Sequence, residues 1–154
     1  MHNEFSIENL IKGKIAELVF EEMFSEMGCT VIPFGYERAV PELRRYNKSK
    51  QGRDVINNFR DTPDFAVISA DKQKIFLIEV KFRSKLGIKE VIKIAQRQIE
   101  RWNPSELFIA TKEGFYLNDC GTIIKNKAIA KLDPCRVSHD LQEKYLKLIQ
   151  EFEK

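Results

Sequence analysis

The chain has 154 residues and a mass of 18.0 kDa, and 43% of its residues are apolar, which suits one domain with a single core and leaves no room for a second catalytic domain. A formal net charge of +3 and a pI near 8.7 permit a nucleic-acid partner without requiring one. The three cysteines include no CxxC pair, which disfavours disulfides and a zinc site. The sequence has no signal-like segment and no apolar run of membrane-spanning length, so we expect a cytoplasmic protein without a membrane partner.

A first helix is predicted from Ser6 or Asn9, either of which can cap it, to Met27, and Gly28 ends it. Glu17 lies on the margin of its apolar face. It is either an ordinary surface glutamate, of which this helix has several, or part of a site. The apolar face consists of Ala16, Val19, Phe20, Met23, Phe24 and Met27.

Residues 29–34 are predicted to form the first strand, and a polar, mostly basic insertion follows at about 35–62 within the single domain 1–154. Short helices are expected at 41–46 and 53–59. A connection this long in a compact domain is usually functional or mobile, so the insertion is either a solvated loop or a phosphate-contacting segment. Its candidate nucleic-acid-binding residues are Arg44, Arg45, Lys48, Lys50, Arg53 and Arg60.

An antiparallel hairpin is predicted next. Pro63 suits the first residue of a strand because it lacks an N–H, which places Asp64 just inside a strand that runs to 68. The short polar connector 69–73 leads into the strongly apolar strand 74–82, which has the pattern of a strand covered on both faces. Asp64 and Glu79 are therefore expected to lie side by side.

Two opposite charges interrupt that apolar strand. Glu79 and Lys81 are two residues apart, so they share a face. Removing either charge from water is costly unless it is paired or bound to a metal. Together with Asp64 they form an oxygen-rich site suited to a hard cation such as Mg²⁺, with Lys81 free to act on a water or a phosphate oxygen.

A helix at 86–102 and a strand at 107–111 then predict a crossover that pairs this strand parallel to 75–82. On the helix, Gln98 and Gln96 are both candidates for the site, although a glutamine is expected on an exposed helix face. The predicted apolar face of this helix consists of Ile88, Val91, Ile92, Ala95, Ile99 and Trp102.

The C-terminal part is predicted to contain a strand at 115–117, an edge strand at 122–124 and a last helix from Ser138 to Phe152. Its apolar stripe would be Leu141, Tyr145, Leu148, Ile149 and Phe152. The order helix, three strands, helix, strand predicts an α/β fold with a mixed central sheet flanked by helices, followed by a C-terminal helix.

Pro63-Asp64 and Glu79-Val80-Lys81 resemble the signature of the PD-(D/E)XK nuclease superfamily, whose restriction-endonuclease-like fold has an αβββαβ core. The resemblance implies that Asp64 and Glu79 hold the metal and that Lys81 orients or activates the attacking water.

Two further motifs extend the resemblance. The segment Gly13 to Glu17 is similar to the first-helix GxxxE of archaeal Holliday-junction resolvases, which implies that Glu17 reaches the metal. The segment Gln98 to Trp102 is similar to the Q(L/I)xxY motif of RecB-like members, with Trp in place of the usual Tyr, which implies a catalytic role for Gln98.

The leading hypothesis is a deoxyribonuclease that uses Mg²⁺ or Mn²⁺, held by Asp64, Glu79 and the carbonyl of Val80, with Lys81 and Glu17 positioning the water. It would act on DNA junctions or as the nuclease subunit of a larger system. A homodimer would suit cleavage of both strands, through 115–117, the Ile123 region or the last helix. The alternatives are a nucleic-acid-binding or scaffold protein that does not cleave, and an unrelated α/β protein with a buried ion pair.

Overall fold

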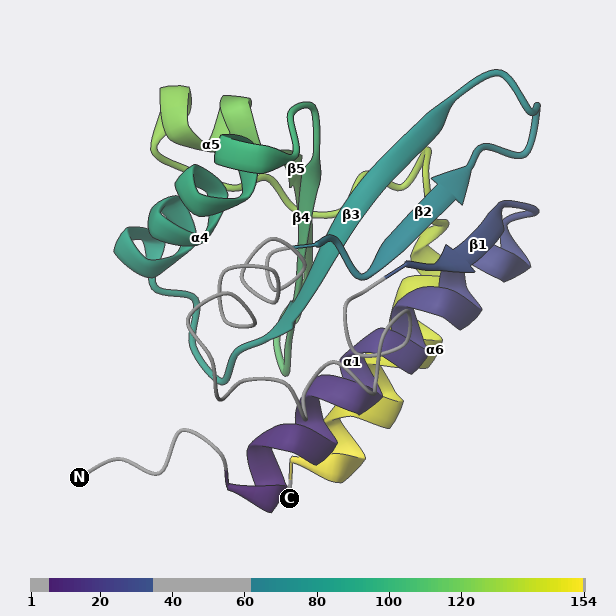
Figure 1. Ribbon diagram of the computed structural model, residues 1–154. Coiled ribbons are helices and arrows are strands. Elements are labelled where there is room, and N and C mark those ends of the chain that lie inside the picture. Colours follow the sequence, from purple (N-terminus) through teal and green to yellow (C-terminus); the bar gives the residue numbers. More distant parts are fainter. Residues whose placement is uncertain (1–5, 35–61, 154) are drawn as a thin grey trace, which may run out of the picture.

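The computed structural model describes residues 6–34 and 62–153, and within them the chain forms a five-stranded sheet with helices on both faces (Figure 1). The expected helices at 41–46 and 53–59, and the six cations of the insertion, lie outside the described residues. The N-terminal helix and the end of the C-terminal helix lie close together at one end of the molecule.

The sheet has the order β1-β2-β3-β4-β5. Neighbouring strands are antiparallel except β3 and β4, which are parallel and joined by a helical crossover, so the sheet is mixed as the sequence predicts. The strands are β1 (Thr30–Pro33), β2 (Phe65–Ile68), β3 (Ile75–Phe82), β4 (Glu106–Thr111) and β5 (Gly114–Asp119). The β2–β3 hairpin is confirmed, with Phe65 paired to Ile78.

The strand that is buried on both faces is β4 and not β3. Every residue of β4 after Glu106 is buried, whereas β3 begins with an exposed Ile75 and is fully buried only from Ile78 to Val80. The apolar run of β3 therefore overstates its burial. Its buried centre is the part that carries Glu79.

One face of the sheet is covered by α1 (Ile7–Glu26) and α6 (His139–Phe152), which lie side by side (Figure 1). Both begin at a serine cap: the side chain of Ser6 accepts from the Asn9 N–H at 3.2 Å, and that of Ser138 from the Leu141 N–H at 3.4 Å. The hydroxyl of Tyr145 donates to Glu26 at 2.6 Å and ties the two helices together.

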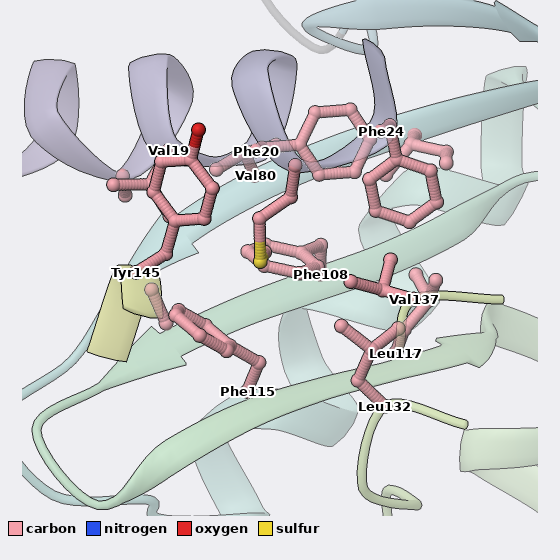
Figure 2. Close-up of a cluster of buried hydrophobic side chains, with 14 of the residues drawn as sticks. Val19, Phe20, Phe24, Val80, Phe108, Phe115, Leu117, Leu132, Val137 and Tyr145 are labelled. Carbon is pink, nitrogen blue, oxygen red and sulfur yellow. The ribbon is translucent and has the colours of Figure 1, made fainter. Parts of the chain in front are cut away.

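The main core lies between this helix pair and the sheet, and aromatic rings dominate it (Figure 2). Phe20 of α1 packs against three other rings, Phe24, Phe65 and Phe108, with centroids 4.5 to 5.1 Å apart. The predicted α1 face is confirmed, since five of its six residues are buried and Met27 is partly buried. The ring contacts fix α1 against β2 and β4, and so fix the height of Glu17 relative to the strands.

The opposite face is covered by α4 (Ile88–Arg101) and α5 (Cys120–Asn126), over a smaller core that includes Val91, Leu107 and Ile109. The predicted edge strand at 122–124 is wrong, because this segment lies inside α5. The side chain of Asp119 accepts from the Thr122 N–H at 3.0 Å and starts the helix. No helix in residues 6–34 or 62–153 is long and apolar enough to cross a membrane.

Candidate active site

Asp64 is held at the start of β2 by two backbone hydrogen bonds. Its carbonyl accepts from the N–H of Phe34 at 2.8 Å, which joins it to the end of β1. Its carboxylate oxygen Oδ2 accepts from the N–H of Val80 at 2.8 Å, which joins it to β3. Asp64 precedes the pair Phe65–Ile78, so the antiparallel register places it opposite Glu79. The side-by-side position predicted from the hairpin is confirmed.

Glu79 and Lys81 lie on the sheet face that α4 and α5 cover. They pair in register with Leu107 and Ile109 of β4, which belong to the core under those helices, while Val80 points to the main core. The side chain of Glu79 is 12% exposed and that of Lys81 is 36% exposed, and Lys81 Nζ lies 3.8 Å from Glu79 Oε2. The charge on Glu79 is therefore almost buried, and Lys81, the described cation that pairs with it, is partly exposed.

Burial raises the pKa of Asp64 to about 9, with further contributions from a hydrogen bond to Glu79 and from the charge of Glu79. The Val80 N–H opposes this shift but does not cancel it. Asp64 therefore carries a proton at neutral pH when no cation is bound. Two adjacent carboxylates in a buried position need a positive charge, which either a proton or a metal can supply.

Glu17 reaches the same cluster from α1. Burial and the charge of Asp64 raise the pKa of Glu17, and the two carboxyl groups are within hydrogen-bonding reach. Lys14, one turn earlier, lies 3.4 Å from Glu17 Oε2. The reading of Glu17 as an ordinary surface glutamate is wrong, since its side chain is only 18% exposed and interacts with Asp64.

The donor chemistry of the cluster fits a hard divalent cation, because three carboxylates from α1, β2 and β3 supply oxygen ligands and an excess of negative charge. Among the residues that the structure describes, however, no group of three or more His, Cys, Asp or Glu side chains is arranged to hold a metal ion. Each carboxylate has a donor of its own instead: Lys14 for Glu17, the Val80 N–H for Asp64 and Lys81 for Glu79.

Gln98 is buried, which corrects the expectation of an exposed position. It is 3% exposed and lies on the sheet-facing side of α4 with Val91 and Ala95, whereas Gln96 is exposed. Its amide nitrogen Nε2 has no hydrogen-bond partner among the described residues. A buried unpaired amide costs about 1 to 3 kcal/mol, so this position selects Gln98 over Gln96 as the site candidate.

Two further groups near Asp64 were not predicted from the sequence. The ring of Trp102, which follows α4, packs edge-on against Phe34 with centroids 5.6 Å apart. The backbone N–H of Phe34 in turn donates a hydrogen bond to the carbonyl of Asp64. Trp102 Nε1 and Thr62 Oγ1 are buried without a described partner. Trp102 could have been selected as a site residue because it ends the Gln98-to-Trp102 motif, whereas no sequence pattern indicates a role for Thr62.

The other residues considered from the sequence are the cations of the insertion, the carbonyl of Val80 and the cysteines. The cations Arg44, Arg45, Lys48, Lys50, Arg53 and Arg60 lie outside the described residues. The carbonyl of Val80 borders the site, because its N–H bonds to Asp64, and its role as a metal ligand stays a prediction. The three cysteines are free thiols.

Comparison with known proteins adds no relative to this picture. No protein-family model matches the chain, and neither the curated proteins nor the solved structures yielded a similar protein. Functional inference for this chain therefore rests on its own residues and on their geometry.

Proposed function

We propose that this chain is a metal-dependent nuclease of the PD-(D/E)XK type, with a restriction-endonuclease-like αβββαβ core, that hydrolyses phosphodiester bonds in DNA. The observation that carries the proposal is the position of Asp64, which interacts both with Glu17 of α1 and with Glu79 of β3, while Lys81 Nζ lies 3.8 Å from Glu79. The element order α1, β1, β2, β3, α4, β4 supports it.

In this proposal Asp64, Glu79 and the carbonyl of Val80 hold Mg²⁺ or Mn²⁺, and Glu17 completes the set. The ion, when bound, supplies positive charge to the scissile phosphate and lowers the pKa of a water. Asp64 would give up its proton if it held such an ion, because a coordinating carboxylate is ionised.

Lys81 supplies a movable cation. Its side chain is half-buried and its ammonium is close to Glu79, so it can leave Glu79 when a metal takes over that carboxylate and can then hold the attacking water or a phosphate oxygen. Gln98 contributes its unpaired amide N–H as a donor to a substrate oxygen. The mostly buried setting strengthens each of these interactions.

A homodimer or a partner subunit follows from the proposal, since one site cuts one strand. Of the three surfaces expected from the sequence, the last helix exposes large apolar side chains, with Leu148 40% and Phe152 61% exposed, whereas Phe115, Leu117 and Ile123 are buried. Selection of DNA junctions and service as the nuclease subunit of a larger system both fit a small chain of this kind.

The decisive experiment separates metal binding from chemistry. Mg²⁺ or Mn²⁺ should raise the melting temperature of the wild type and of Lys81→Ala, because a ligand that binds the folded state stabilises it, and should not raise that of the double variant Asp64→Ala, Glu79→Ala. Cleavage of DNA should fall roughly a hundredfold to ten-thousandfold in Lys81→Ala. A wild-type turnover in Lys81→Ala would refute the role of Lys81, and an equal metal shift in the double variant would refute the site.

A second candidate is a nucleic-acid-binding protein that keeps the fold without cleaving. It is favoured by the arrangement of the carboxylates, each of which is engaged by a donor from the chain itself. The same experiments separate the two candidates. A protein that binds DNA, but shows neither a metal-dependent rise in melting temperature nor cleavage, would be the non-cleaving binding protein.

A further inference from the structure

The layer formed by α4 and α5 carries a basic surface. We call it the basic face; its exposed cations are Lys85, Lys89, Lys93, Arg97, Lys125, Lys127 and Lys131. Few acids offset them. Glu90 forms an ion pair with Arg83 at 2.6 Å, Asp119 caps α5, and Glu100 is exposed near the end of α4. The layer therefore presents a net positive potential to solvent.

The opposite layer has the reverse charge. The helices α1 and α6 together carry eight acidic residues and four lysines, and several of these lysines are paired with carboxylates in the same layer, such as Lys12 with Glu153 at 3.1 Å and Lys144 with Glu26 at 3.3 Å. A polyanion is consequently attracted to one side of the sheet and repelled by the other.

Three cations of the basic face form a regular row. Lys89, Lys93 and Arg97 are four residues apart on α4, so they line one side of the helix at steps of about 6 Å. None of them forms an ion pair or a hydrogen bond with another residue in the described part of the chain. A row of unpaired cations spanning about 12 Å matches the closely spaced phosphates of a nucleic-acid strand.

The chemistry of this surface favours a duplex over a single strand. Single-stranded nucleic acids are held by aromatic side chains on which bases stack, and neither α4 nor α5 contains an aromatic residue. Trp102 follows α4 directly but packs against Phe34. Cations without stacking platforms contact the backbone of a double helix.

The basic face lies on the same side of the sheet as the candidate active site. Glu79 and Lys81 share the face of β3 and β4 that α4 and α5 cover, because they pair with Leu107 and Ile109. The row of cations and the carboxylate-bearing face of β3 are therefore on the same side of the sheet, with α4 between them.

We infer that the basic face, through Lys89, Lys93 and Arg97, binds the phosphate backbone of a nucleic-acid duplex and presents it to the carboxylate site. The inference deepens the proposed nuclease function and rests on it for the reaction, but the binding itself is independent of cleavage. The shared chemistry of the ligand is a double row of phosphates, which duplex DNA and duplex RNA both supply.

The test measures binding without chemistry. The affinity of the full chain for a short fluorescein-labelled DNA duplex, followed by anisotropy in EDTA, is recorded between about 50 and about 200 mM salt. The triple variant Lys89→Gln, Lys93→Gln, Arg97→Gln should flatten the log–log salt slope by about two to three units and weaken binding. The control, Lys112→Gln, Lys144→Gln, Lys147→Gln, removes equal charge from the β4–β5 turn and α6 and should keep the wild-type slope.

Each outcome decides one question. Equal slopes in the triple variant and the wild type, equal flattening in both variants, or tighter wild-type binding to the single strand than to the duplex would overturn the inference. A flatter salt slope of the triple variant on duplex DNA or on duplex RNA supports the inference. The duplex that the wild type binds more tightly identifies the natural ligand. Cleavage assayed separately with Mg²⁺ tests the function: binding without any cleavage would defeat the nuclease proposal alone.

Discussion

Asp64 is the residue whose ionisation most affects the metal-free protein. Its pKa is raised to about 9 in the folded chain, against about 4 in an unfolded one. The folded state therefore keeps a proton that the unfolded state loses, so the contribution of Asp64 to stability is fully present below about pH 4 and is lost as the pH rises towards 9. Between about pH 5 and about pH 8 the melting temperature of chelator-treated protein should decline.

The variant Asp64→Asn is the matched control for this pH dependence. The amide has the shape of the carboxyl group and cannot ionise, so its melting temperature should decline less over the same range. An equal decline in Asp64→Asn would assign the effect to other groups. Added Mg²⁺ should reduce the decline in the wild type only, because the ion takes the place of the proton.

Gln98 has a buried unpaired amide that should lower the free energy of unfolding. Replacement by leucine removes the buried unpaired amide and keeps most of the volume, so Gln98→Leu should raise the free energy of unfolding by about 1 kcal/mol. If the amide serves a substrate, the same variant should lose DNA cleavage. Urea denaturation and a cleavage assay measure the two effects.

The exposed Gln96 supplies the control for Gln98. Gln96→Leu should change neither stability nor cleavage appreciably, because its side chain is solvated. A Gln98→Leu variant that is more stable and fully active would reduce Gln98 to a packing residue.

The elements that the sequence predicts well are those with local signals at both ends. The first helix is bounded by the Ser6 cap and by Gly28 at φ +87, and the hairpin by Pro63 and a five-residue polar connector. These signals act through neighbouring residues, so no tertiary information is needed to use them.

Two features depended on tertiary contacts that the sequence does not display. The run Thr122-Ile123-Ile124 is β-branched and favours a strand, but Cys120 and Ile123 are buried against the α4 side of the core at helical spacing. Likewise a glutamine in an amphipathic helix is expected in solvent, and only the packed structure turns Gln98 inwards. The common face of Glu79 and Lys81 was predictable from strand periodicity, and the place of Asp64 beside Glu79 from the hairpin that joins β2 to β3.

The cap of α5 gives a quantitative test at the scale of the element. Asp119 accepts from the N–H of Thr122 at 3.0 Å, so Asp119→Ala should lower the free energy of unfolding by about 1 kcal/mol. Asp119→Asn or Asp119→Ser should retain most of that stability, since both side chains are good caps. Losses of similar size in the alanine and asparagine variants would show that charge and not capping stabilises α5.

At the scale of the whole molecule, the acidic α1–α6 layer also carries most of the large exposed apolar side chains. These are Ile7, Leu10, Ile11, Leu18, Leu148 and Phe152. Contact between two copies through this layer would bury them and leave both basic faces outward. The repulsion between the acidic layers is screened by salt, so dimerisation should strengthen as salt rises while DNA binding weakens.

Sedimentation at micromolar concentration measures this association. The double variant Ile11→Ser, Phe152→Ser should be monomeric at every salt concentration, whereas Ile75→Ser, which removes a still more exposed residue on β3, should behave as the wild type. A wild type that stays monomeric at high salt would rule out this surface.

The hydrogen bonds that hold Asp64 have a consequence for the synthesis of the chain. Asp64 is fixed by the backbone of Phe34 and of Val80, and β3 is completed by β4, which ends at Thr111. A ribosome that has released only the first eighty residues has already made all three carboxylates but cannot yet bring them into position. A translation product interrupted there should accordingly be unable to cleave nucleic acids, which confines the proposed activity to chains that extend at least through β4.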